Sequence, residues 1–375
     1  MNGRVADPVV LAEAESQPLR AVRPALRVGP VSLVLRPRMV VIVMLLAALV
    51  FVLFCLDVAF GETTVPLGRV LDVLAGGGTR SQRYIILDSR LPRALTAVVV
   101  GAALGLAGAI TQSILHNPLA SPDLLGVTTG ASLGAVAVLV FAGIGSTGLA
   151  ATVGAPLAAL ACGLLTAVLI YLLAWGRTAG NGHGATGLRF VLIGIGVNAL
   201  LAACLSWLVA QADTEDAARA QQWLAGSLNF ADSRALVPAA LALGVVTVVA
   251  LCSARTLAAM RMGEDTTRVL GVRVQTQQAI LIGAAVVAAS VATAAVGPVG
   301  FVALAAPQIA RRVLRTPGEP LIGSLLIGAV LVAGADVASR TLFPVDLPVG
   351  VVTAGAGGPF LLYLLVRMNR KATLS

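Results

Sequence analysis

Ten apolar stretches constrain the fold of this chain more than any other feature of its sequence. They lie at residues 39–60, 94–115, 124–144, 147–175, 190–210, 235–253, 279–297, 298–310, 321–338 and 347–366. Most of them reach the roughly 20 residues that an α-helix needs to cross a bilayer. A helix satisfies its own backbone hydrogen bonds, so it is the structure expected for each stretch in lipid. The sequence therefore predicts an all-α, polytopic membrane protein with about ten transmembrane helices.

One stretch, 298–310, is too short to span a bilayer as a helix of its own. It directly follows Gly297 and Pro298, two residues that interrupt regular structure. We therefore expect this stretch to be tilted or partly buried behind other helices.

The scarcity of charged residues separates this chain from soluble proteins. Only 11% of its residues are charged, whereas a soluble domain has roughly 25%. A net charge of +9 on a soluble chain would suggest nucleic-acid binding, but here the arginines flank apolar stretches, where they fix the orientation of spans. Membrane lipid, and no nucleic acid, is therefore the expected partner of these basic residues.

The distribution of basic residues predicts the topology. Of the 26 Lys and Arg residues, 18 lie in connections on the side of the amino terminus and 8 on the opposite side. Because basic residues are enriched in cytoplasmic connections, both termini are expected in the cytoplasm. The sequence divides into a polar cytoplasmic tail at 1–38, a ten-helix membrane domain at 39–367 and a short cytoplasmic tail at 368–375.

Residue patterns for catalysis or metal binding are missing from the sequence. A phosphate-cradling loop needs GxxxxGK[ST], yet the only lysine, Lys371, precedes Ala372 near the carboxyl end. His116 and His183 are isolated, so neither a metal site nor a serine–histidine protease pair is indicated. None of the four cysteines belongs to a CxxC pair. We expect a transport subunit with no enzyme activity, no metal and no cofactor of its own.

Two acidic residues fall within the apolar stretches, both near an end. They are Asp57 and Asp336, and Asp336 precedes Arg340 by four residues. This spacing places Asp336 and Arg340 on one helical face and predicts an intrahelical ion pair. A proton relay would need more intramembrane acids than these.

Three glycines, Gly101, Gly105 and Gly108, share one face of the second predicted helix. Small faces let membrane helices approach closely, because lipid gives helices no hydrophobic drive to associate. We therefore interpret this face as a tight helix-packing surface.

A proline-containing segment, HNPLASPDLLGVTTGAS, separates the second and third apolar stretches at 116–132. Its two prolines predict a cytoplasmic turn, with Asp123 able to cap the third helix. Polar residues on either side of the turn are candidates to line a translocation path, although such residues often satisfy neighbouring backbone groups instead. The candidates are Gln112, Ser113, Asn117, Thr128, Thr129 and Ser132. A passive channel built from two NP-containing half-helices is the alternative, but the NP pair occurs only once.

Several motifs together resemble one known family. They are RLPR at 90–93 with the following GAALGLAGAITQSILHNPLASPDLLGVTTGAS, then MGEDTTRVLGV at 262–272, GPVGFVALAAPQIARR at 297–312, ADVASR and LPVGVVTAGAGGPFLLYLL. In this order they resemble the iron-siderophore and cobalamin family of ABC importer permeases, over about 39–367. APQIARR is similar to the ferric-enterobactin branch. Gln308 stands where many members have histidine, so no imidazole role is transferred.

This resemblance implies a type II ABC importer permease fold and a function. The chain is expected to translocate a ferric siderophore across the bacterial inner membrane by alternating access, with cobalamin or haem as alternative cargo. ATP is used by two copies of a cytoplasmic ATP-binding subunit. The other expected partners are a second permease, homologous but different, and an extracytoplasmic siderophore-binding protein.

The resemblance also implies two contact sites. Arg90, Arg93 and Arg340 match positions that dock glutamates of the binding protein, a task suited to guanidinium because it grips a carboxylate with two hydrogen bonds. The alternative is that Arg90 and Arg93 anchor a helix end at lipid headgroups. The segment near 262–272 reads as a short amphipathic helix that contacts the ATPase, the alternative being a solvated loop helix. Its contact residues are Gly263, Glu264, Asp265, Arg268, Val269, Leu270 and Gly271.

Overall fold

Apolar helices occupy the positions of all ten predicted stretches. The computed structural model describes residues 25–28, 31–34, 37–60, 65–142, 149–174, 176–178, 182–184, 187–231 and 233–372. The ten helices are α2 (Pro37–Ala59), α5 (Leu91–Leu115), α6 (Val127–Ala142), α7 (Leu149–Ala174), α8 (Gly187–Gln211), α10 (Ser233–Cys252), α13 (Val274–Val296), α14 (Val302–Leu314), α15 (Leu321–Thr341) and α16 (Val349–Ala372).

Within the described ranges, eight helices are long and apolar enough to cross a membrane. The two others are α6, with 16 residues, and α14, with 13. The helix α14 begins after Gly297 and Phe301, which both have positive φ, and it buries Ala303, Ala306 and Gln308. The expectation of a short, partly buried helix after Gly297 is therefore confirmed.

Shorter helices occur in the connections, where the sequence predicted only the one near 262–272. They are α3 (Leu67–Leu74), α4 (Arg80–Arg83), the π-helix η1 (Tyr84–Arg90), α9 (Thr214–Leu224), α11 (Ala254–Met260), α12 (Glu264–Val269) and the 3₁₀ helices η2 (Pro122–Leu125) and η3 (Leu228–Phe230). The elements α4, η1 and α5 form one continuous helix, so the predicted start at residue 94 is wrong. Thr79 and Gln82 form a reciprocal capping box, which starts the helix at Arg80.

Two short antiparallel hairpins complete the described structure. Strands β1 (Ala25–Val28) and β2 (Val31–Val34) lie in the predicted amino-terminal tail, and β3 (Gly176–Thr178) pairs with β4 (Gly182–Gly184) between α7 and α8. The chain forms two compact units, Met1–Met44 and Leu45–Ser375. The helix α16 continues to Ala372, past the predicted start of the carboxyl-terminal tail at 368. Otherwise the predicted division at 1–38, 39–367 and 368–375 stays a prediction.

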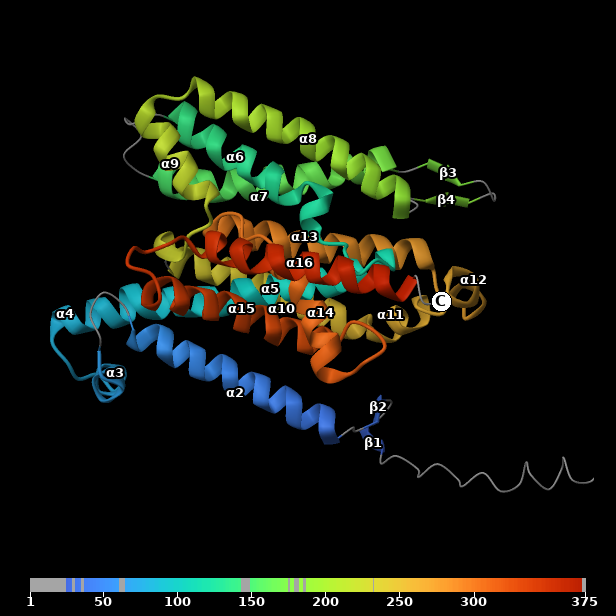
Figure 1. Cartoon of the computed structure of the whole chain (residues 1–375), viewed down its shortest axis with the longest axis horizontal. Helices are drawn as coiled ribbons and strands as arrows, with labels where there is room; N and C mark the ends of the chain where they lie inside the picture. Colours follow the sequence, from blue (N-terminus) through green and yellow to red (C-terminus); the bar gives the residue numbers. More distant parts are fainter. Residues whose placement is uncertain are drawn as a thin grey trace, which may run out of the picture. The chain divides into compact units, whose positions relative to one another are not determined.

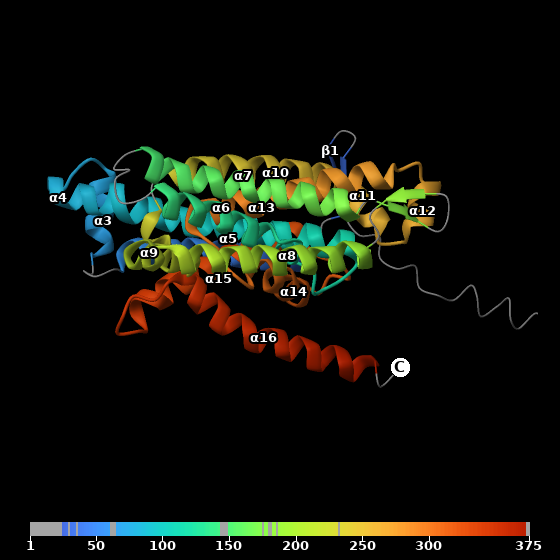
Figure 2. The ribbon, with the colours of Figure 1, turned by 90° about the horizontal axis from the view of Figure 1, so that it is seen from above.

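In the unit Leu45–Ser375, α5 is the central helix. It packs against α10, α13, α14 and α15, and α13 in turn contacts α6 and α7. Figure 1 shows α5, α10, α13 and α15 running side by side, with α6, α7 and α8 grouped beyond α13. Figure 2 shows α16 diverging from the packed helices toward its carboxyl end. The burial of α5 explains why its sequence is apolar and small on all sides.

The glycine face of α5 makes this packing possible. A Cβ atom at Gly101 would collide with the carbonyl oxygen of Gly328, and one at Gly105 would collide with the carbonyl oxygen of Ser324, both on α15. A Cβ atom at Gly108 would collide with the backbone of α14. The predicted tight helix-packing surface is therefore confirmed.

Candidate functional site

Four charged residues meet at one end of the helices, where α2 and α15 end and α5 begins. Arg93 on α5 donates from Nε to Oδ2 of Asp336 at 3.0 Å and from Nη2 to Oδ1 at 2.7 Å. Arg340 donates to the same Oδ2 at 2.8 Å and also contacts the carboxylate of Asp57 on α2. Both carboxylates are buried, with exposed fractions of 1% for Asp57 and 0% for Asp336. The predicted pair of Asp336 and Arg340 is confirmed, but it belongs to a larger network.

The carboxyl end of α2 is held by two arginines. Arg90 donates from Nη1 to the carbonyl oxygens of Val58 and Ala59, at 3.1 and 3.0 Å. Arg340 donates to the carbonyl oxygen of Phe60 at 3.1 Å. The last carbonyls of a helix lack intrahelical partners and carry partial negative charge, so guanidinium groups stabilise this end.

The structure brings the three predicted docking arginines into one cluster and engages each of them within the chain. We call Arg90, Arg93, Arg340, Asp57 and Asp336 the outer charge cluster. Arg90 is buried, and the side chains of Arg93 and Arg340 are 16% and 8% exposed. Three arginines and two aspartates leave one positive charge in excess. Docking of a binding protein on these arginines stays a prediction.

At the opposite end, the proline-containing segment forms the predicted turn. The helix α5 ends at Leu115, and His116 adopts a left-handed conformation with φ 49°. Oδ1 of Asn117 accepts a hydrogen bond from the backbone N–H of Leu119 at 3.0 Å, a local turn that asparagine favours. His116 also contacts the carbonyl oxygen of Met260 at 3.0 Å, which ties the turn to α11.

The candidate path residues differ in their burial. Gln112, Ser113 and Ser132 are buried, whereas Asn117, Thr128 and Thr129 are half-buried. The Thr129 hydroxyl donates to Oδ1 of Asn198 on α8, a partner that the sequence did not indicate. A role in lining a path stays a prediction for all six.

Gln112 and Gln308 pair inside the chain. Nε2 of Gln308 donates to Oε1 of Gln112 at 2.6 Å, and Nε2 of Gln112 donates to the carbonyl oxygen of Leu304 at 3.1 Å. Their positions in the sequence are 196 residues apart, so no local pattern predicts the contact. These bonds satisfy the buried amides and join α5 to α14.

The predicted ATPase-contacting segment forms a helix with one buried side and one exposed side. In α12, Gly263 precedes the first turn with φ 100°, and Gly271 follows the last with φ 78°. Both conformations favour glycine, so the predicted helix and its stop are confirmed. Buried Thr267 holds one side, because its Oγ1 lies 2.9 Å from the carbonyl oxygen of Ala259 and 2.7 Å from that of Gly263.

The other side of this segment is exposed and partly apolar. Val269 is 88% exposed and Leu270 is 61% exposed. Arg268 is also exposed. Glu264 and Asp265 form the start of the helix, but their side chains lie outside the described ones. Contact with an ATPase stays a prediction for these residues.

Comparison with known proteins decides the family. The model of the FecCD transport family matches residues 49–367, which cover eight of the ten apolar helices completely, most of α16 and about half of α2. The chain belongs to the FecCD transport family.

Curated relatives cover most of the FecCD chain. It is 39% identical over 312 residues to the ferric enterobactin transport system permease protein FepG of Escherichia coli strain K12. This match covers 83% of this chain and 91% of that protein. It is 35% identical over 328 residues to the iron(3+)-hydroxamate import system permease protein FhuG of Bacillus subtilis strain 168. This match covers 86% of this chain and 95% of that protein. The predicted family resemblance is therefore confirmed.

A solved structure shares the fold of the FecCD chain. It is an inward-facing conformation of a chain described as a metal-chelate type ABC transporter, with a TM-score of 0.73 and 24% identity. The match covers 88% of this chain and 99% of that chain. The predicted helical permease fold is confirmed.

In the FecCD chain, one carboxylate connects the α12 region to α14. Glu319, between α14 and α15, accepts a hydrogen bond from Nη1 of Arg311 at 2.8 Å. Arg261, which follows α11, donates to the carbonyl oxygen of Glu319 at 3.1 Å and pairs with its carboxylate at 3.8 Å. Arg261 also reaches Oγ of Ser113 at 3.5 Å. Arg311 and Glu319 are separated by a turn, so helical spacing did not indicate this bridge.

Asp123 has an unusual environment in the turn between α5 and α6. Its Oδ1 is buried without a hydrogen-bond partner in the described structure. Burial raises the pKa of this carboxyl to about 6, and a side-chain hydrogen bond with Thr128 opposes that rise. The FecCD chain therefore carries a carboxyl in η2 that takes up a proton at mildly acidic pH.

Proposed function

We propose that this FecCD chain is the permease subunit of an ABC importer for a ferric siderophore. It would act in the bacterial inner membrane, with both termini in the cytoplasm, by alternating access driven by ATP hydrolysis on a separate subunit. The 39% identity with FepG over 83% of the chain carries the proposal. The identity with FhuG, an iron(3+)-hydroxamate import permease, supports the same cargo class.

Energy coupling would pass through the segment around α12. An isolated chain leaves Val269 and Leu270 largely in contact with solvent. Fully burying an aliphatic side chain of this size stabilises a contact by about 1.5–3 kcal/mol, so a groove on an ATP-binding subunit is a suitable receptor. Two such subunits and a second, related permease would complete the cytoplasmic and membrane parts of the importer.

Recognition of the binding protein would use the outer charge cluster. Its excess positive charge favours an acidic partner, and Arg90, Arg93 and Arg340 supply the forked donors that carboxylates accept. Partner carboxylates would then compete with Asp57 and Asp336 for the same guanidinium groups. Replacing an arginine of the cluster should therefore lower the affinity for the binding protein, whereas replacing an aspartate should raise it.

The translocation path would follow the weakly polar residues near the turn at 116–126. Asn117, Thr128 and Thr129 are half-buried, so they are nearer to a surface than Gln112, Ser113 and Ser132. Small, neutral side chains suit a bulky cargo that must be released, because they offer no strong charge to retain it.

The test is radio-iron uptake in a strain from which the gene for this chain has been deleted. The strain is offered defined ferric siderophores, with labelled cobalamin and labelled haem as controls. We expect loss of uptake for one siderophore class and restoration by the plasmid-borne chain. Loss of cobalamin or haem uptake alone would redirect the cargo assignment. A partner ATPase that cannot hydrolyse ATP separates the classes of mechanism, because flux through a passive channel would persist.

A further inference from the structure

The guanidinium group of Arg93 has a further partner that lies outside the outer charge cluster. Its Nε and Nη2 donate to the carboxylate of Asp336, and its Nη1 donates to Oδ1 of Asn229. Asn229 lies in η3, in the connection between α9 and α10. Arg93 is therefore held along one edge by a buried carboxylate and at its remaining nitrogen by a neutral amide.

These two partners of Arg93 differ in what their release costs. The side chain of Asp336 is fully buried, so removing its donors would leave a buried charge poorly compensated, which is strongly unfavourable. Asn229 is exposed, so water can satisfy its amide once Arg93 is engaged elsewhere. An incoming carboxylate adds charge attraction and a second hydrogen bond, and the amide oxygen supplies neither. Asn229 is therefore the partner of Arg93 that a carboxylate replaces at the lower cost.

We propose that Asn229 is the side chain that a carboxylate of the docking partner displaces from Arg93. This inference rests on the proposed docking of the binding protein on the outer charge cluster. With Nε and Nη2 engaged by Asp336, a second carboxylate that accepts two parallel hydrogen bonds must use Nη1, the nitrogen that already donates to Asn229. Asn229 thus orients the guanidinium before docking and competes with the partner for it.

The connection that carries Asn229 is held in place by contacts of its backbone. The N–H of Ser227 donates to the carbonyl oxygen of Val296 at 2.8 Å, and the N–H of Gly350 donates to the carbonyl oxygen of Gly226 at 2.9 Å. These bonds fasten the connection to the end of α13 and to the start of α16. A substitution at Asn229 therefore changes a partner of Arg93 and leaves the backbone contacts of the connection in place.

The test measures, by surface plasmon resonance, the affinity of the assembled importer in detergent for the purified extracytoplasmic binding protein of the same importer. Asn229→Ala removes the competing amide, whereas Asn229→Asp places a carboxylate beside Arg93. The matched controls are Gln222→Ala and Gln222→Asp, because Gln222 is an exposed residue of the preceding helix α9. It makes no hydrogen bond to Arg93, so Gln222→Asp adds the same charge without occupying that guanidinium.

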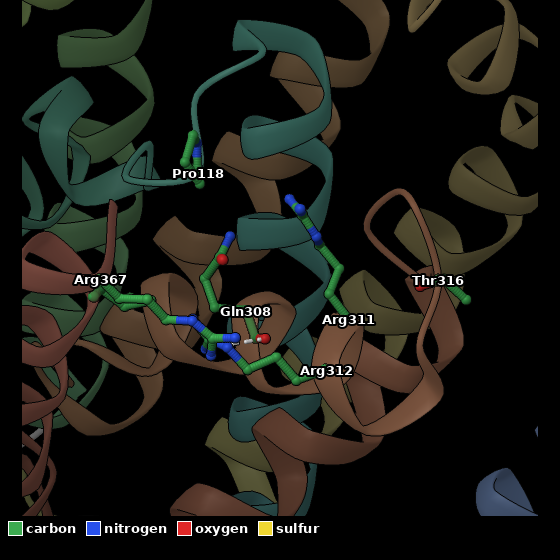
Figure 3. Close-up of a pocket in the computed structure, with 7 residues that line it drawn as sticks. Pro118, Gln308, Arg311, Arg312, Thr316 and Arg367 are labelled. Carbon is green, nitrogen blue, oxygen red and sulfur yellow. Dashed lines mark hydrogen bonds between the residues drawn. The ribbon is translucent and has the colours of Figure 1, made fainter. Parts of the chain in front are cut away.

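The loss of the Arg93 guanidinium has a control of its own. Arg93→Gln is compared with Arg367→Gln, which removes an exposed arginine at the opposite end of the helices. Figure 3 shows Arg367 there, with its guanidinium group converging with that of Arg312 beside Gln308. The double variant Arg93→Gln/Asn229→Ala completes a double-mutant cycle, which isolates the coupling between the two residues.

We expect Asn229→Ala to raise the affinity about three- to tenfold, Asn229→Asp to lower it about tenfold, and the three control variants to stay within about twofold. In the Arg93→Gln background, Asn229→Ala should have no effect. Should one Asn229 variant fail to assemble, the other one decides.

The outcomes that overturn the inference are distinct from those that overturn the docking proposal. If Arg93→Gln leaves the affinity unchanged, docking on the outer charge cluster fails and the inference fails with it. If Arg93→Gln weakens docking and Asn229→Ala does not strengthen it, the displacement of Asn229 alone is overturned. Equal weakening by Asn229→Asp and Gln222→Asp also overturns it, because the added charge then acts without occupying Arg93.

Discussion

Arg93 and Asp336, which are 243 positions apart, join α5 to α15 through two parallel hydrogen bonds of 3.0 and 2.7 Å. The carboxylate is fully buried and is shared with Arg340. A buried charge is tolerated only when it is paired and hydrogen-bonded. The outer charge cluster therefore stabilises the packing of α5 on α15, independently of any partner that it binds.

Replacing Asp336 by Asn should destabilise the chain strongly. The substitution leaves the largely buried guanidinium groups of Arg93 and Arg340 with one carboxylate fewer, and breaking a buried pair costs about 3–5 kcal/mol. Unfolding of the purified chain in detergent measures the loss. The control is Glu215→Gln on α9, where Glu215 and Arg219 are exposed and 3.8 Å apart; such a pair contributes about 0–1 kcal/mol. Equal losses in the two variants would contradict the prediction.

The outer charge cluster also gives the docking proposal a test with opposite signs. Arg93→Gln removes a guanidinium and should weaken affinity for the binding protein by about tenfold. Asp336→Asn removes a competing carboxylate and should raise this affinity, although it perturbs the same cluster. Equilibrium binding at two salt concentrations provides the measurement, with folded protein selected by gel filtration. If both variants bind the binding protein more weakly, the cluster stabilises the fold and does not contact the binding protein directly.

Gly105→Ala should separate α5 from α15. The new methyl group would collide with the carbonyl oxygen of Ser324, and overpacking of this kind costs about 1–3 kcal/mol. Gly244→Ala is the matched control, because a Cβ atom at Gly244 meets nothing within 4 Å. Alanine there should stabilise α10 by up to about 1 kcal/mol. Melting temperatures of the two variants should therefore shift in opposite directions.

Leu270→Asp should uncouple ATP hydrolysis from transport without unfolding the chain. Leu270 is 61% exposed, so a charge there is tolerated by the isolated permease but not in an apolar contact with an ATPase. Substrate-stimulated ATPase activity of the reconstituted importer should be lost while the melting temperature of the permease is retained. Thr267→Val, which alters the buried side of α12, should instead lower stability. Normal stimulation in Leu270→Asp would favour a solvated loop helix.

Asp123 should make stability depend on pH. Its folded-state pKa of about 6 lies above the ordinary value of 3.8, so the native state binds the proton more tightly than the unfolded state. Stability should therefore fall as pH rises from about 4 to 7, by on the order of 2 kcal/mol. Asp123→Asn should remove that fall, whereas Asp88→Asn at an exposed position of η1 should preserve it. Unfolding profiles between pH 4.5 and 7.5, values chosen about the pKa, distinguish the two variants.

Apolar length predicts the ten main helices because a span needs about 20 apolar residues. The same signal cannot find η1 or α9, because both lie outside the apolar stretches. It also cannot find β3 and β4, where the described pairing joins Arg177 to His183 within a glycine-rich sequence. Helical structure near Leu270 was predictable from Glu264 and Asp265, which favour a helix start, and from Gly271 as a helix stop.

The contacts of the candidate sites depend on tertiary structure. Spacing by four residues predicted the pair of Asp336 and Arg340, but no periodicity connects Asp336 to Arg93. Gln112 meets Gln308 only because α14 packs on α5. The family resemblance therefore singled out the three arginines and Gln308, while their partners required the fold.

Glu319 has a mechanical consequence for the chain. It pairs with Arg261 beside α12 and with Arg311 on α14 at the same time, so one carboxylate links the two segments. A displacement of α12 must either carry α14 with it or break one of the two ion pairs. Movement of α12 therefore occurs either together with α14 or with a change of partner at the Glu319 carboxylate.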